Sequence, residues 1–257
     1  MNGCKTRYPL VLAHGLARPD SGVRRPTWGR VPEALRAAGA TVYLAGQDAW
    51  GSIETGASQL ARAVDRALRE TGSGKVNLIA HSKGGLEARY LISRMGYAGR
   101  VASLSMIATP NRGSGVAGAL LRVRPAVALW AKGNDAAWRG RDAAPDSLRA
   151  GEQLTPAYLE RFNRETPDAP GVYYQSWGAR IGARHADGAM ALTRALFFFA
   201  HGASDGLVTP DSARWGAYRG TLEGVSHQQL VDVTAGGDFD AVAFYRSLVF
   251  DLAEKGL

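Results

Sequence analysis

The chain has 257 residues, of which 46% are hydrophobic, so it is long enough to bury a sizeable core. Its formal net charge is +8, but the basic side chains are scattered from Arg7 to Lys255 without a concentrated face, which argues against nucleic-acid binding. No apolar run approaches the ~20 residues of a membrane span, and the N-terminus lacks the basic and apolar regions of a signal peptide. We therefore expect no transmembrane segment, and the cellular location is left open. The one cysteine, Cys4, excludes an intrachain disulfide.

Strand and helix signals alternate along the chain. The predicted strands are short apolar runs at residues 8–13, 41–44, 76–80, 101–108 and 172–177. One helix is expected to start near Pro32, a second spans residues 53–69 with apolar side chains at helical spacing, and Asp238 is expected to cap a final one. This order predicts an α/β fold, in which helices flank both faces of a mostly parallel sheet. Ligands of such sheets bind beyond the carboxyl ends of the strands.

A long insertion, at about residues 111–170, separates the fourth and fifth predicted strands. Its apolar residues recur at spacings of 4, 3, 4 and 3, which is typical of one face of a helix. These residues are Val116, Leu120, Val123, Val127 and Trp130. Pro125 either kinks that helix or starts a second one, and the apolar face either packs into the core or forms a mobile lid over a pocket. The sequence contains no internal repeat and no linker, so we expect a single domain, 1–257, carrying this insertion.

A strand, a sharp turn and a helix signal meet at Ser82. This arrangement is typical of a G-x-S-x-G turn, which holds a serine hydroxyl at the carboxyl edge of a parallel sheet. The small residues that such a turn needs are Ala80 and Gly84, so the pattern is A-x-S-x-G; the alternative is an ordinary turn serine before a helix. A nucleophilic serine in this setting uses two main-chain N–H groups to stabilise the oxyanion. We expect them from Lys83 and from Leu16, after the first strand.

A serine nucleophile needs a base and an acid, which follow it along the chain in the order acid, then histidine. His227 is the candidate base, because it alone among the five histidines comes late enough to leave room for an acid and a strand before it. His81 adjoins Ser82 and is expected to point away across the turn. Asp205 is the favoured acid, since it lies in a tight loop before a glycine. Its rivals are Asp211 and Glu223.

Several stretches of the chain together resemble the bacterial true lipases, and within them the compact, disulfide-free Proteus-type lipases of family I. These stretches are residues 8–16, 76–90, 154–162, 171–174, 205–208 and 226–227. The resemblance implies an α/β-hydrolase fold with a helical lid in the insertion. It also implies that Ser82 is the nucleophile, Asp205 the acid and His227 the base, with an oxyanion hole formed by Leu16 and Lys83.

Many of these lipases hold a structural calcium between an aspartate about twenty residues before the catalytic acid and another two residues after the catalytic histidine. Asp187 lies 18 residues before Asp205, but Gln229 stands two residues after His227. A hard cation prefers several charged oxygens, so the loss of one carboxylate weakens the case for calcium. We expect no required cofactor.

The sequence therefore predicts a serine carboxylic-ester hydrolase, and most specifically a triacylglycerol lipase that works through an acyl-enzyme. The expected partner is a lipid or ester substrate, met at a lipid–water interface, and the expected state is a monomer. A short-chain carboxylesterase or polyester depolymerase with the same triad is the nearest alternative. A non-catalytic binding protein with a hydrolase fold is the alternative of another class.

Overall fold

The computed structural model describes residues 3–20, 22, 26–181, 203–233 and 239–257. These residues form a six-stranded sheet with the strand order β2-β1-β3-β4-β5-β6. The strands are β1 (Leu10–Ala13), β2 (Val42–Leu44), β3 (Val76–His81), β4 (Val101–Ile107), β5 (Tyr173–Arg180) and β6 (Ala217–Glu223). Every neighbouring pair is parallel, so the predicted parallel sheet is confirmed.

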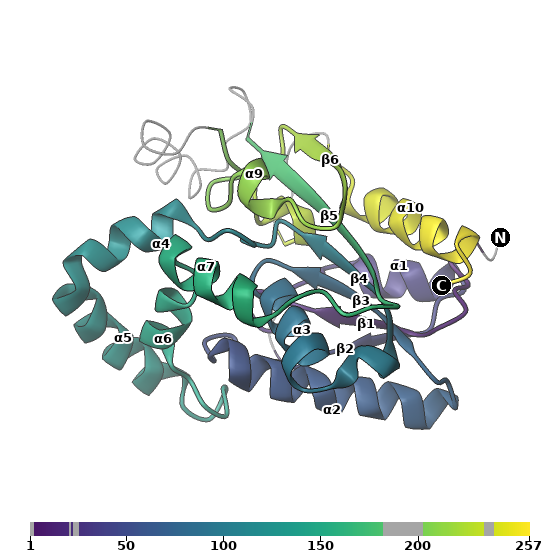
Figure 1. The fold of residues 1–257 in the computed structure, drawn as a ribbon, viewed down its shortest axis with the longest axis horizontal. Helices are drawn as coiled ribbons and strands as arrows, with labels where there is room; N and C mark the ends of the chain where they lie inside the picture. Colours follow the sequence, from purple (N-terminus) through teal and green to yellow (C-terminus); the bar gives the residue numbers. More distant parts are fainter. Residues whose placement is uncertain (1–2, 21, 23–25, 182–202, 234–238) are drawn as a thin grey trace.

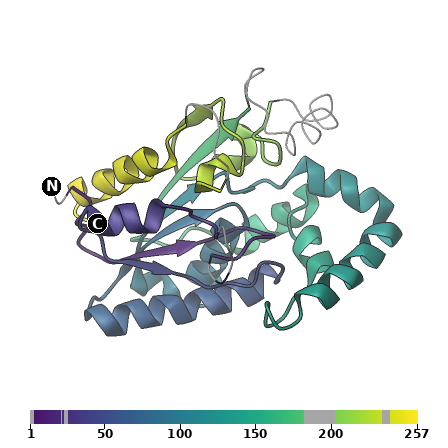
Figure 2. The ribbon, with the colours of Figure 1, turned by 180° about the vertical axis from the view of Figure 1, so that it is seen from behind.

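Helices cover both faces of this sheet (Figures 1 and 2). On one face lie α2 (Ile53–Thr71) and α3 (Lys83–Arg94), and on the other lie α1 (Val31–Ala37) and α10 (Ala241–Glu254). Side chains alternate between the two faces, so neighbours such as Leu78 and Ile79 belong to different core clusters. Because both faces are buried, the central strands read as continuous apolar runs rather than as an alternating pattern.

Local signals set the ends of the helices. The Ser52 side chain accepts a hydrogen bond from the Thr55 N–H at the start of α2, and Gly72, with φ 67°, ends that helix. At the start of α10 the Asp240 carboxylate accepts the N–H of Ala243. The expectation that Asp238 caps this helix is therefore wrong by two residues, and Asp238 itself lies outside the described residues.

The sequence pattern does not predict β6, and β5 runs three residues further than expected, to Arg180. As an edge strand, β6 has only partly buried or exposed residues, so it lacks the apolar run that marked the other strands. It begins after α9 (Pro210–Ala213) and precedes the loop that contains His227.

The insertion forms α4 (Gly115–Leu120), a 3-10 turn at Leu121–Val123, α5 (Arg124–Trp138), α6 (Ser147–Glu152) and α7 (Pro156–Glu165). Figure 1 shows α4 and α5 projecting away from the sheet, whereas α7 leads back to it. Pro125 lies in the first turn of α5 and thus starts a second helix. No described helix is both long and apolar enough to cross a membrane.

The outer helices of the insertion do not pack into the core. Leu120, Val123 and Trp130 are 52%, 58% and 53% exposed, and Ala131 is the buried residue of α5. Core packing is therefore the wrong interpretation of this apolar face. The exposed arrangement is explained by position, because α4 and α5 project away from the sheet and, among the described elements, pack mainly on the 3-10 turn between them and on α6.

Candidate active site

Ser82 alone forms the turn between β3 and α3, and its backbone is strained. Its φ of 54° and ψ of −130° lie in a region that non-glycine residues rarely adopt. The turn brings α3 hard against β1: a Cβ at Gly84 would lie 2.5 Å from the carbonyl oxygen of His14 and 2.6 Å from that of Ala13. Glycine is therefore required two residues after the serine, as the motif predicts.

The loop that follows β1 passes directly beside Ser82. A Cβ at Gly15 would lie 2.7 Å from the Cβ of Ser82, so this position also has no room for a side chain. Leu16 comes next in that loop, while Lys83 is the first residue of α3, where a main-chain N–H has no intrahelical acceptor. The structure thus brings the segments of the two predicted oxyanion donors next to the serine.

His227 and Asp205 are hydrogen-bonded, with 2.7 Å between Nδ1 and Oδ2. Asp205 is fully buried, and its Oδ1 accepts the main-chain N–H groups of Leu207 and Val208 at 2.9 and 2.8 Å. The main-chain N–H of His227 donates to the Asp205 carbonyl, 2.9 Å away. Because the imidazole is held through Nδ1, its Nε2 is the nitrogen left to act as a base in the neutral ring.

The rival acids lie elsewhere. The Asp211 side chain is 90% exposed and pairs with Arg214, 3.3 Å away. Glu223 pairs with Arg180 at the surface. Sequence spacing left these alternatives open, whereas the structure places Asp205 alone of the three against the imidazole of His227.

His81 is a residue of this site whose role the sequence did not reveal. The sequence indicated only that it points away across the turn, and the structure shows that its ring lies against that of His227, with 4.5 Å between ring centroids. His81 is buried, and burial together with the neighbouring His227 holds its pKa well below the usual value for histidine. Strand alternation could have found this contact, since His81 shares a face with Ile79, and the His227 loop packs on that face through Val225.

The comparisons with known proteins concern the family and the fold. No protein-family model matches the chain. It is 32% identical over 258 residues to triacylglycerol lipase 2 of Saccharomyces cerevisiae, a match that covers 89% of this chain and 74% of the yeast protein. This chain belongs to the triacylglycerol lipase family. A triacylglycerol lipase of Vibrio cholerae is 29% identical over 285 residues, covering 98% of this chain and 90% of its own.

Solved structures show the same fold for this lipase-family chain. The crystal structure of Staphylococcus hyicus lipase superposes with a TM-score of 0.74 at 17% identity, covering 97% of this chain and 96% of that one. A metagenomic carboxyl esterase superposes with a TM-score of 0.76 at 16% identity, covering 97% and 76%. At such identities the likeness concerns the fold alone. The predicted α/β-hydrolase fold is therefore confirmed, and the chain is a carboxylic-ester hydrolase by family.

The described residues of this lipase-family chain do not assemble a calcium site. Asp187 lies outside them. The side-chain oxygen of Gln229 accepts the main-chain N–H of Ser226 at 2.8 Å, so it stabilises the loop that contains His227. Within the described ranges there is no group of three or more His, Cys, Asp or Glu side chains able to hold a metal ion.

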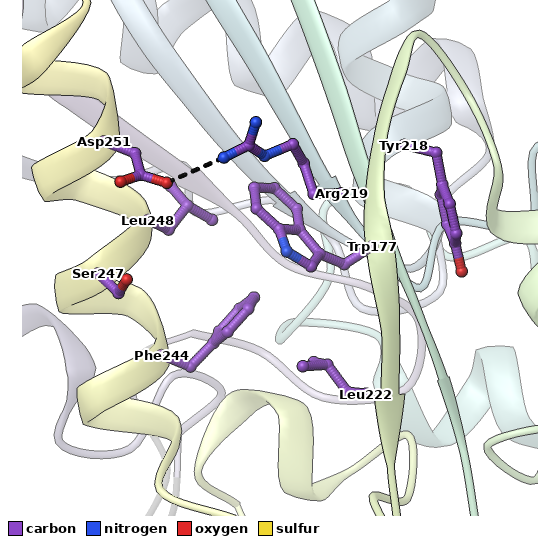
Figure 3. Close-up of a pocket in the computed structure, with 8 residues that line it drawn as sticks. All are labelled: Trp177, Tyr218, Arg219, Leu222, Phe244, Ser247, Leu248 and Asp251. Atoms are coloured by element: carbon purple, nitrogen blue, oxygen red, sulfur yellow. Dashed lines mark hydrogen bonds and ion pairs between the residues drawn. The ribbon is translucent and has the colours of Figure 1, made fainter.

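A hollow of about 360 Å³ lies on the α10 face of the sheet, between β5, β6 and α10 (Figure 3). Its lining residues are Trp177, Tyr218, Arg219, Leu222, Phe244, Ser247, Leu248 and Asp251. An ion pair of 3.2 Å between Arg219 and Asp251 crosses one side of it. The lining includes neither Ser82 nor His227, so this hollow is distinct from the candidate active site of the lipase.

Proposed function

We propose that this chain hydrolyses acyl glycerol esters, with Ser82, His227 and Asp205 as its catalytic triad. The observation that carries the proposal is that His81, which precedes the strained Ser82 turn, lies against His227, whose Nδ1 is held by a fully buried carboxylate. The names of its relatives support the acyl glycerol substrate. The single cysteine and the quoted motifs also favour the compact, disulfide-free Proteus-type group of family I.

In the proposed reaction, Oγ of Ser82 attacks the ester carbonyl while Nε2 of His227 takes the hydroxyl proton. The carbonyl oxygen becomes an oxyanion that accepts hydrogen bonds from the N–H groups of Leu16 and Lys83, each contributing roughly 3 kcal/mol. His227 then gives its proton to the departing alcohol, which leaves an acyl-Ser82. Water attacks this ester through the same base, releasing the fatty acid and restoring Ser82. Asp205 orients the imidazole and stabilises its charged form.

A fluorophosphonate probe tests this assignment, because it reacts with activated serines. We expect the probe to label wild-type protein at Ser82, and Ser82→Ala to lose labelling and about a million-fold in turnover while keeping its fold. Loss of activity should accompany an unchanged circular dichroism spectrum. An unlabelled wild type, or a Ser82→Ala variant that turns over a short ester at a tenth of the normal rate, would overturn the proposal and favour a non-catalytic binding protein or another nucleophile.

The exposed apolar side chains of α4 and α5 support a second part of the proposal, that the insertion is a lid that meets a lipid surface. They include Leu129, which is 74% exposed, and Trp130. Exposed apolar area costs roughly 25 cal/mol per Å² in water, and a lipid surface removes that cost. A short-chain esterase or polyester depolymerase is the rival. A panel of chromogenic esters from acetate to palmitate separates the two, since a preference for short soluble chains with ordinary saturation would favour the rival.

We further propose that catalysis needs no metal or cofactor, because Gln229 stands where the resemblance to family I lipases implies a carboxylate, and its side-chain oxygen accepts the main-chain N–H of Ser226. Removing divalent cations with EDTA should leave ester hydrolysis unchanged and shift the melting temperature by about one degree or less, on the scale of a surface change. Differential scanning fluorimetry with and without added calcium checks this. A large drop that calcium alone reverses would contradict it.

A further inference from the structure

Lys83 follows Ser82 directly, yet its long cationic side chain is buried. The side chains of Lys83 and Glu87, one helical turn apart on α3, are each 1% exposed and form an ion pair. Lysine and glutamate are almost never fully buried unless they are paired. Replacing such a pair with apolar side chains of similar size is often neutral or stabilising, so stability alone does not account for these two charges.

The Glu87 carboxylate also reaches a second segment. Its Oε2 accepts a hydrogen bond from the side-chain amide of Gln47, which lies in the loop after β2. The amide oxygen of Gln47 in turn accepts the main-chain N–H of His14, 3.1 Å away. One carboxylate therefore links the first turn of α3 to the loop that follows β1.

Two further contacts fix this connection. The His14 ring, itself buried, lies between two main-chain carbonyl groups. Its Nε2 is 2.9 Å from the main-chain oxygen of Gln47, and its Nδ1 is 2.7 Å from that of Gly15. Gly56 on α2 gives Glu87 its space, since a Cβ there would collide with the carboxylate. Burial raises the pKa of Glu87, and the Lys83 ammonium opposes that effect.

We propose that Lys83, Glu87 and Gln47 form a positioning network that sets the separation between the two oxyanion donors, the N–H groups of Leu16 and Lys83. This inference rests on the proposed function. The network holds one donor segment through the Lys83 side chain and the other through the Gln47 contact with His14. Oxyanion donors act only within a narrow range of distances from the developing charge, and a displacement of ~1 Å can lower the rate by about 100-fold.

The double variant Lys83→Met/Glu87→Leu tests this network, because it removes both charges and leaves neither one unpaired. We expect its melting temperature to stay within about five degrees of the wild type, because removing the buried ion pair offsets the loss of the acceptor of the Gln47 amide. On a soluble chromogenic ester, we expect kcat to fall by about 100-fold and KM to stay within about twofold. Affinity for an alkyl boronic acid, whose tetrahedral adduct places an oxygen in the oxyanion hole, should fall in parallel with kcat. A merely structural pair would not produce this combination.

Arg89→Met is the matched control, since Arg89 is another buried cation of α3 and bonds to Asn163 and the Thr166 carbonyl, away from the two donor segments. It should lower the melting temperature yet keep kcat. If the double variant fails to fold, Glu87→Gln, which is nearly isosteric, replaces it, and its kcat and boronic-acid affinity should fall together by about tenfold.

Wild-type kcat in a folded double variant, or an equal kcat loss in Arg89→Met, would overturn the network. Such a result would leave the proposed function standing as long as the fluorophosphonate still labels Ser82. An unlabelled wild type would instead overturn the proposed function, and the network with it.

Discussion

The turn at Ser82 and the outer helices of the insertion differ in how closely their small and apolar residues are packed. At the turn, a single added carbon at Gly84 meets two main-chain oxygens of β1, whereas at Gly133 in α5 it meets no atom within 4 Å. Every residue of β3 is buried, but Leu129 of α5 is 74% exposed. The comparison shows that close packing is concentrated around the Ser82 turn, where it holds the reacting groups in place. It leaves the insertion with apolar surface that nothing in the described chain covers.

The largest effect is expected in the buried site, at Asp205. Asp205→Asn should lower kcat/KM by about ten-thousand-fold with little change in stability, because an amide cannot stabilise the charged imidazole and favours the wrong tautomer of His227. Steady-state hydrolysis of a soluble ester measures this. Asp211→Asn is the control, since its side chain is 90% exposed, and it should keep normal activity. The reverse result would move the acid to Asp211.

A pair of alanine substitutions compares the two regions directly. Gly84→Ala should destabilise the protein by about 3 kcal/mol or more, because β1 or α3 must move to relieve the overlap with main-chain oxygens. Gly133→Ala, in an open helical position, should instead stabilise it by about 0.5–1 kcal/mol. Urea unfolding followed by circular dichroism gives both values. Similar effects at the two glycines would contradict the packing difference.

The burial of His81, with His227 beside it, lowers the pKa of His81 and makes stability depend on pH. Below the ordinary histidine value of 6.5, the unfolded chain binds a proton at His81 that the folded chain, whose pKa is lower, does not. Stability should therefore fall as pH decreases through that range. His81→Phe keeps a ring beside His227, and between pH 7.5 and 5.5 it should lose about 1 kcal/mol less than the wild type. Urea unfolding at both pH values is the measurement. An identical pH dependence in the wild type and His81→Phe would show that the folded structure does not lower the pKa of His81.

The smallest effect is expected on the exposed side. Leu129→Ser should change stability by less than about 0.5 kcal/mol, yet reduce severalfold the activity on an emulsified medium-chain triglyceride, while hydrolysis of soluble esters is kept. Phe250→Ser is the control, because Phe250 is also a large exposed apolar residue, 47% exposed, but lies on α10. Equal losses in both variants, or none in either, would argue against a lid that meets the interface.

Short apolar runs predicted the buried strands, and helical spacing predicted the start of α2, because each depends on neighbours along the chain. The sequence pattern missed β6, since a half-exposed edge strand carries no apolar run. It identified the apolar residues of α4 and α5 but not that Leu120, Val123 and Trp130 are exposed, because exposure depends on how distant segments pack. The contact of Glu87 with Gln47 joins segments 40 residues apart, and such pairs leave no local pattern to read.

The place of β6 has a consequence for how the enzyme would fail on heating. Asp205 precedes this strand and His227 follows it, and among the described strands β6 pairs only with β5. Edge segments open in local fluctuations that cost less free energy than global unfolding. Peeling β6 away would separate the acid from the base while the central strands stay intact. Thermal inactivation would then precede the main melting transition. The lifetime of activity at high temperature would therefore depend on the pairing of β5 with β6 rather than on the packing of the core.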